Sequence, residues 1–153
     1  MKKGQLIESF TIDDLEDISL SAIYQYWLDK KGARDMPSRA EIFPEDIAPY
    51  LSNLCLVDVE HDTNRYKFRL VGTQTVKALG FEITGQYLDK LPSVEKVVKP
   101  RYDWLVEHKR PYYIADQLKW SEKTFIRVRT LALPLSSNGK DVDIIMFVLN
   151  YII

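Results

Sequence analysis

The sequence has one cysteine, two histidines, no surplus of either charge and no long hydrophobic run. The single cysteine, Cys55, cannot form a disulfide within the chain, which is typical of a reducing compartment. With 21 basic and 22 acidic residues, the chain lacks the positive charge that favours binding to nucleic acids or anionic membranes. No apolar stretch is long enough for a transmembrane helix, and residues 1–20 lack the apolar segment of a signal peptide. We therefore expect a cytoplasmic protein that binds neither nucleic acid nor membranes.

The chain also lacks the patterns of metal sites and of common catalytic sites. Cys55, His61 and His108 lie far apart and do not have the spacing of metal ligands. Asp58 and Asp89 are the two strongest candidates among the carboxylates for acid–base catalysis, but neither has a partner carboxylate at a spacing that indicates it. The serines lack the pattern of a nucleophile elbow. We expect no metal and no catalytic residue.

The length of 153 residues suits one domain. Residues 1–17 are polar and acidic, and we expect an N-terminal arm, loose or forming a short strand. Residues 18–153 are expected to form the domain itself, with a helical extension over 18–50 and a core over 51–153.

Residues 18–32 are predicted to form an amphipathic helix, with Ser19 as its N-cap and Gly32 as its end. The apolar residues at helical spacing are Leu20, Ile23, Tyr24, Trp27 and Leu28. Either the domain's own sheet or a second copy of the chain must cover this stripe. We expect a homodimer formed through it.

The connector over residues 36–51 is rich in turn signals. Ser38 and Glu41 are spaced as a capping box, Pro44 starts a short helix, and Pro49 limits its length.

The rest of the chain has the composition of strands separated by short helices. Strand patterns occur at 54–60, 65–72, 111–120, 124–135 and 142–153, and helical patterns at 73–80, 84–91, 94–98 and 101–109. Pro92 and Pro100 are expected to break the helices, and Asn138-Gly139 indicates a hairpin. Five strands interrupted once by helices indicate an α+β domain with one antiparallel sheet.

Glycines between a strand and a helix raise the question of a phosphate-binding loop. Gly80 and Gly85 are not followed by the lysine and hydroxyl of a P-loop, and three tightly spaced glycines in a βαβ unit are absent. We interpret this stretch as a corner of the fold. Gly72 lets the chain leave its strand, Gly80 ends a helix, and Thr73 and Thr84 cap helices.

Two sets of side chains suggest contact surfaces. Lys67 and Arg69 alternate on one predicted strand, and Arg127 and Arg129 alternate on another, so a basic stripe for an acidic partner is expected if the two strands are neighbours. Aromatic residues gather in the helical region and the strands beside it; they are Tyr66, Phe68, Phe81, Tyr87, Tyr102, Trp104, Tyr112, Tyr113 and Phe125. This set suits a packed core, or a pocket for a small aromatic or heterocyclic molecule.

The element order and three motifs resemble those of small bacterial single-domain PAS proteins. The matching motifs are Pro37-Ser38-Arg39, Phe68-Arg69-Leu70 followed by Gly72-Thr73, and Thr84-Gly85 followed by Leu88-Asp89. The resemblance covers residues 22–151. It implies a PAS-like five-stranded antiparallel sheet with short helices on one face and a pocket between the layers.

We expect this pocket to be lined by Phe68, Leu70, Phe81, Tyr87, Tyr102, Trp104, Tyr113 and Val128. His108 lies where haem-binding PAS domains carry their axial ligand, but no second ligand is identifiable. The chain has no cysteine at the position that flavin photosensors use. No cofactor is therefore named.

The leading hypothesis is a non-enzymatic PAS-type sensory or interaction module that binds a small molecule or a protein and signals through a separate protein. Two alternatives remain open. One is a small enzyme on an α+β cavity fold, resembling a thioesterase or an isomerase. The other is a structural adaptor with a filled core. A cavity lined by Asp58 or His108 favours the enzyme, a cavity without them favours the sensor, and a filled core favours the adaptor.

Overall fold

The computed structural model describes residues 5–117 and 126–152. The end of the strand predicted over 111–120, the start of that over 124–135, and Phe125 lie outside these ranges. The helices, with η marking 3-10 helices, are η1 Ile12–Leu15, α1 Ile18–Lys31, η2 Arg39–Glu41, η3 Pro44–Asn53, α2 Thr73–Leu79, η4 Leu88–Lys90 and α3 Pro92–His108. The strands are β1 Leu54–Glu60, β2 Arg65–Val71, β3 Tyr112–Gln117, β4 Arg127–Leu135 and β5 Ile144–Ile152.

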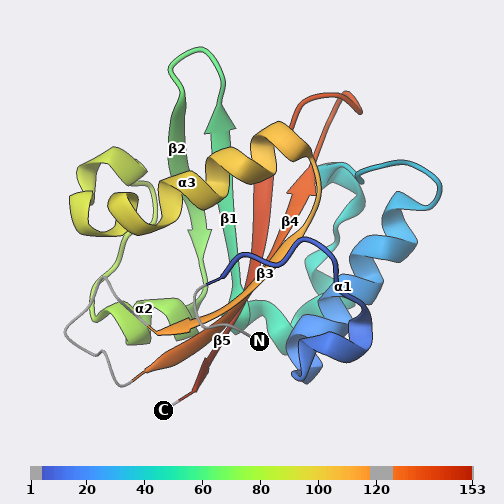
Figure 1. Cartoon of the computed structure of the whole chain (residues 1–153), viewed down its shortest axis with the longest axis horizontal. Coiled ribbons are helices and arrows are strands. Elements are labelled where there is room, and N and C mark those ends of the chain that lie inside the picture. The colour runs from blue at the N-terminus through green and yellow to red at the C-terminus, as the bar shows by residue number, and fades with distance from the viewer. Residues whose placement is uncertain (1–4, 118–125, 153) are drawn as a thin grey trace.

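The five strands form one antiparallel sheet in the order β2-β1-β5-β4-β3 (Figure 1), which confirms the predicted α+β fold. β5 lies at the centre, and residues 144–149 are buried on both faces, as its continuous apolar composition predicts. β4 and β5 are joined by residues 136–143, a longer loop than the hairpin expected at Asn138-Gly139. Because β1 and β5 separate β2 from β4, the expected basic stripe does not exist.

The two sheet faces have different covers. α2 and α3 cover one face, here called the inner face, and α3 crosses the sheet in Figure 1. α1 packs against β4 and β5 on the other, outer face, where Leu20, Ile23 and Trp27 are buried. The Trp27 indole N–H donates to the Pro134 carbonyl at 3.0 Å. The apolar stripe of α1, with Tyr24 and Leu28 partly buried beside it, is thus covered by its own sheet.

The described part of the N-terminal arm contacts the edge of the sheet. Ile7 pairs with Tyr113 at the free edge of β3 through two backbone hydrogen bonds of 2.9 Å. η1 follows, and Leu15 within it is fully buried. The helix α1 is capped by Asp17 rather than by Ser19, because the Asp17 carboxylate accepts from the Leu20 N–H while Ser19 is already inside the helix.

A β-bulge divides β2. Leu56 pairs with Leu70 and Val57 with Phe68, which leaves Arg69 as the extra residue. Strict alternation would place Phe68 and Leu70 on one face, but the extra residue reverses the alternation. Phe68 therefore points to the inner face and is buried, whereas Leu70 points to the outer face and is 43% exposed.

Prolines interrupt the helices less than predicted. α3 continues through Pro100 as one helix of 17 residues, and Pro49 lies inside η3 beside a kink at Ile47. The predicted helix break at Pro100 is therefore wrong. Short helices broken by Pro92 and Pro100 would weigh against a thioesterase of the hot-dog type, which needs a long helix beside its cavity. Because α3 is continuous, this argument no longer holds, and the residues around the cavity must decide.

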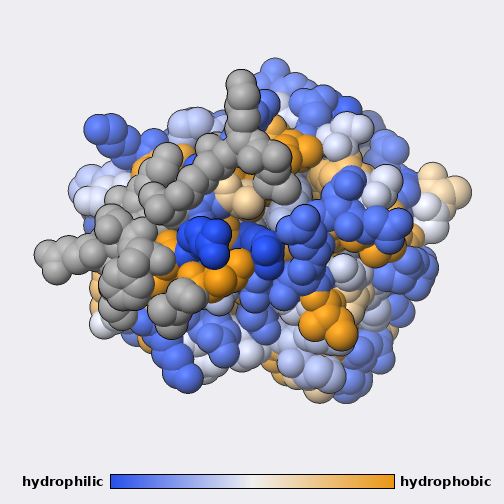
Figure 2. Space-filling model, turned by 60° about the horizontal axis from the view of Figure 1, so that its bottom comes forward, coloured by the Kyte–Doolittle hydropathy of each residue, from blue (hydrophilic) through white to orange (hydrophobic). Residues whose placement is uncertain are grey.

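Figure 2 shows one face of the molecule in space-filling form. Outside the grey atoms, hydrophobic surface appears there as separate patches between hydrophilic residues. Within the described ranges, no helix has the length and apolar character that crossing a bilayer requires.

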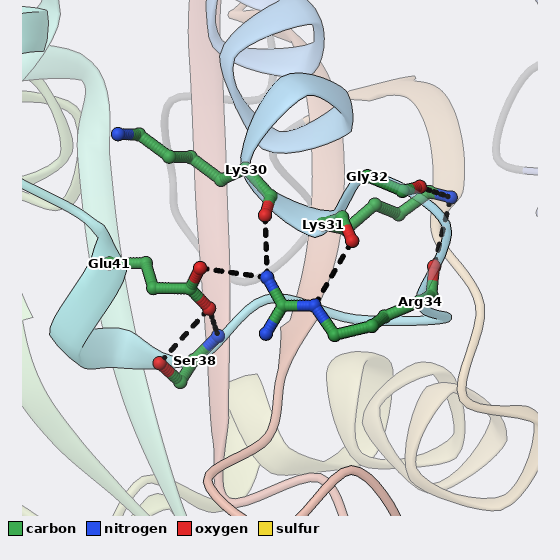
Figure 3. A network of polar contacts seen from close by, with 6 residues as sticks. All are labelled: Lys30, Lys31, Gly32, Arg34, Ser38 and Glu41. Carbon is green, nitrogen blue, oxygen red and sulfur yellow. Dashed lines mark hydrogen bonds and ion pairs between the residues drawn. The ribbon is translucent and has the colours of Figure 1, made fainter.

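Hydrogen bonds of the Arg34 side chain stabilise the loop that follows α1 (Figure 3). Its guanidinium donates to the Lys30 and Lys31 carbonyls at 2.6 and 3.1 Å and to the Glu41 carboxylate at 2.7 Å. Glu41 also accepts from the Ser38 N–H, which completes the predicted capping box. This network holds η2 against the end of α1.

The Arg34 and Ser38 hydrogen bonds lower the pKa of Glu41 to about 2. A lowered pKa means that the fold favours the ionised form, so the stabilisation is complete above the unfolded pKa of about 4.3 and is lost as the pH falls towards 2. We expect Glu41→Gln to reduce the free energy of unfolding by less than about 1 kcal/mol at neutral pH, because water screens this exposed pair. Urea denaturation at about pH 7 and about pH 3 should show the difference shrinking at the lower pH. A difference independent of pH would contradict this account.

Candidate ligand-binding cavity

The glycine amides at the corner next to β2 are not available to a phosphate. The Gly72 N–H donates to the Leu54 carbonyl at 2.7 Å, and the Gly85 N–H donates to the Phe68 carbonyl at 2.6 Å. Gly80 ends α2 in the left-handed conformation, as predicted. The capping roles predicted for Thr73 and Thr84 are wrong, since Thr73 is the first residue of α2 and the Thr84 hydroxyl bonds Glu82. These glycines therefore allow the tight turns of the backbone at this corner.

An internal cavity of about 60 Å³ lies between the inner sheet face and the helices α2 and α3. It has room for only a few water molecules. The apolar part of its wall consists of Val57, Phe68, Leu79, Ile83, Val94, Val98, Phe147 and Leu149. The polar part consists of Cys55, Thr75, Arg101, Tyr102, Tyr112, Thr130 and Tyr151.

One side of the polar wall is a short hydrogen-bond chain. The Cys55 thiol lies 3.5 Å from the Thr75 hydroxyl, which lies 2.9 Å from the Tyr151 hydroxyl. Burial raises the pKa of the Cys55 thiol and that of the Tyr151 hydroxyl. The cysteine therefore stays protonated and unreactive, as its apolar strand predicts.

The polar wall also includes two tyrosines, Tyr102 and Tyr112, and one member of a buried ion pair, Arg101. Arg101 on α3 donates to the Asp116 carboxylate on β3 at 2.7 Å, with side-chain exposures of 16% and 1%. Within the described ranges, the hydroxyls of Tyr102 and Tyr112 have no hydrogen-bond partner. Burial raises the pKa of both, so both remain neutral donors. These donors can bind the polar group of a molecule in the cavity.

Of the eight residues predicted to line the pocket, Phe68 and Tyr102 do so. Leu70 is turned to the outer face by the bulge, and Phe81 is half exposed in the loop after α2. Tyr87 lies beyond the edge of the sheet, where its ring stacks under Arg65 and its hydroxyl donates to Glu60 at 2.6 Å.

The remaining three do not line the cavity either. Trp104 stacks on His108, with 4.5 Å between ring centroids. Tyr113 points to the outer face, because Tyr112 before it takes the inner position. Val128 shares with Tyr113 a separate hollow of about 300 Å³.

The sequence analysis missed most of the polar wall. Alternation along the strands could have found Thr130 and Tyr151. Leu149 on β5 pairs with Thr130, and Tyr151 lies two positions after Leu149, so all three side chains share one face of the sheet. Arg101 and Thr75 had no such signal, because the way each helix faces the sheet is set by packing.

The other titratable candidates are engaged elsewhere. Asp58 pairs with Arg69 at 2.7 Å on the outer face, and Asp89 pairs with Arg65 at 2.6 Å. A ring nitrogen of His61 lies 2.8 Å from the Val142 carbonyl. Among the described residues, no group of three or more candidate ligands could hold a metal ion.

Comparison with known proteins gives the family. A family model described as a PAS domain matches residues 15–149. Among solved structures, an RNA-binding Light-Oxygen-Voltage receptor is similar at 7% identity, with a TM-score of 0.46 over 75% of this chain and 35% of that one. This chain spans about a third of that receptor's length. No curated protein matches. Because the family model covers most of the chain and the sheet has the expected antiparallel form, the chain belongs to the PAS domain family.

Proposed function

We propose that the chain is a non-enzymatic sensory module of the cytoplasm, which binds a small molecule in the internal cavity and signals through a separate protein. The observation that carries this proposal is the cavity wall. Tyr102 and Tyr112, whose hydroxyls have no hydrogen-bond partner among the described residues, line it together with apolar side chains, and ligand pockets combine a few polar groups with apolar walls in this way.

The small volume of the cavity supplies a mechanism. A molecule larger than a few atoms needs more room than this cavity has, and movement of α2 and α3, which form one wall, away from the sheet would supply it. Binding would thus shift the helix layer, and the partner would sense that shift.

The residues around the cavity weigh against the enzyme alternative. Asp58 lies on the outer face and His108 lies at the end of α3, and neither lines the cavity. The described polar side chains that line it include no carboxylate or histidine to act as a general base. The predicted homodimer through α1 is not proposed further, because the stripe that would form it packs on the sheet.

Two valine replacements on α3 test the site. Val98 lines the cavity, whereas Val97 beside it is partly buried but does not. Native mass spectrometry of the purified protein should show a retained small molecule. Val98→Ile should weaken its retention by about tenfold or more, because one extra methyl group fills space that the ligand needs. Val97→Ile, the matched control, should retain it as the wild type does. A wild type without bound molecule, or equal retention by both variants, would contradict the proposal.

A further inference from the structure

Another hollow, about 370 Å³ in volume, lies on the outer face between η3 and the strands β1 and β2. We call it the outer groove. Its lining residues are Arg39, Ile42, Pro44, Ile47, Leu51, Ser52, Leu54, Leu56, Leu70, Val71, Gly72, Thr73 and Met146. We infer that the outer groove docks an amphipathic helix of the output protein, with apolar residues on the groove floor and a carboxylate on Arg39. This goes beyond the proposed function and does not require a ligand in the cavity.

Two of the apolar residues that line the outer groove are exposed leucines. Leu51 and Leu70 line the groove and are 40% and 43% exposed, although α1 and η3 bury most apolar side chains of this sheet face. The bulge at Arg69 turns Leu70 outward, so its exposure is built into the strand. Single exposed apolar residues are ordinary, but here Leu51 and Leu70 lie in one groove with further apolar lining, and contiguous apolar surface of that kind is typical of protein interaction sites.

Arg39 is the only charged residue among the described ones that line the groove, and it would bind the partner's carboxylate. Its guanidinium donates to the Ile42 carbonyl at 2.8 Å, and no described carboxylate forms an ion pair with it. Glu41, two positions along, is already bound by Arg34 (Figure 3). A partner's carboxylate would therefore find an unpaired positive charge beside the apolar floor.

Pairing of an extended strand with the edge of β2 fits less well. The Phe68 N–H donates to the Gln86 carbonyl, and the Phe68 carbonyl accepts from the Gly85 N–H. β2 ends at Val71, and α2 begins at Thr73, so little free edge remains. A helix, which needs no backbone partner, is the occupant that the groove can accept.

The groove and the cavity share one element. Gly72 and Thr73, at the start of α2, line the groove, while Thr75 and Leu79 of the same helix line the cavity. A ligand that moves α2 would change the shape of the groove. The groove is therefore placed to transmit the state of the cavity.

The test uses a fluorescein-labelled amphipathic helical peptide of Leu, Ala and Glu, and a matched peptide with Lys in place of Glu. Fluorescence anisotropy with the full chain should show the acidic peptide binding about tenfold more tightly or better. Arg39→Glu should reverse this preference. Leu70→Asp and Leu51→Asp should each abolish binding. Phe81→Ser removes a similarly exposed side chain, 49% exposed but outside the groove, and should bind like the wild type.

Three results would overturn the inference. They are equal binding of the two peptides, loss of binding in Phe81→Ser, and a wild-type dimer in analytical ultracentrifugation that Leu70→Asp converts to a monomer. The last result would mean that a second copy of the chain occupies the groove. Urea denaturation identifies any variant that fails to fold, and the two leucine positions give independent readings.

Discussion

Arg101→Met is expected to lower the free energy of unfolding by about 3 to 5 kcal/mol, as is typical when one partner of a buried ion pair is removed. Asp116 is 1% exposed, and Arg101 supplies the opposite charge at 2.7 Å across the gap between α3 and β3. Methionine fills a similar volume but leaves the Asp116 carboxylate without that charge in a poorly solvated place. Urea denaturation followed by circular dichroism measures the loss.

Two further variants separate burial from charge. Lys99→Met breaks the ion pair of Lys99 with Asp103 on the same helix, which is much more exposed, and should cost less than about 1 kcal/mol. The double variant Arg101→Met/Asp116→Leu should recover much of the stability that Arg101→Met loses, because the buried carboxylate is removed together with the guanidinium. If Arg101→Met and Lys99→Met cost the same, the Arg101–Asp116 pair is solvated and the description of the cavity wall is wrong.

Gly72→Ala is expected to destabilise the protein by about 3 kcal/mol or more, at the upper end for overpacking. A Cβ atom at this position would lie 2.5 Å from the Ser52 carbonyl oxygen and 2.6 Å from that of Leu54. Both are backbone atoms, so they cannot rotate away. Relief requires η3 to separate from the start of α2, which also breaks the Gly72–Leu54 hydrogen bond.

Gly139→Ala is the matched control. Its φ of +77° disfavours a side chain, but no atom lies within 4 Å of the added Cβ. We expect a cost of about 1 to 2 kcal/mol from backbone strain alone. Equal losses from the two replacements, measured by urea denaturation, would show that close approach of the backbone is not the reason for glycine at 72.

The fold was more predictable than the cavity, for a physical reason. β5 and the hairpin of β1 and β2 follow from local composition and alternation, and the α1 stripe follows from helical spacing. Each signal lies within a short stretch of chain, so no tertiary information is needed. The cavity wall instead combines side chains from every strand of the sheet with those of α2 and α3, and it includes only Phe68 and Tyr102 of the residues named from the sequence as candidates for lining a ligand pocket.

Two wrong predictions, the direction of Leu70 and the helix break at Pro100, each depend on a single residue. The bulge at Arg69 sends Leu70 to the outer face, although the alternation through Phe68 predicts the inner one. Pro100 was expected to end a helix, but α3 continues through it. In both cases a long-range pairing or packing contact outweighs the local preference.

The sequence by itself determined the strands, the amphipathic α1 and the absence of a phosphate loop, because hydrophobic period and glycine spacing act locally. Only the tertiary structure decided what covers α1, which tyrosine hydroxyls reach the cavity, and that Leu51, Leu70 and Arg39 share one groove. These features depend on the order of strands in the sheet and on one extra residue in β2. Both are set by the balance of packing over the whole domain, which no local pattern encodes.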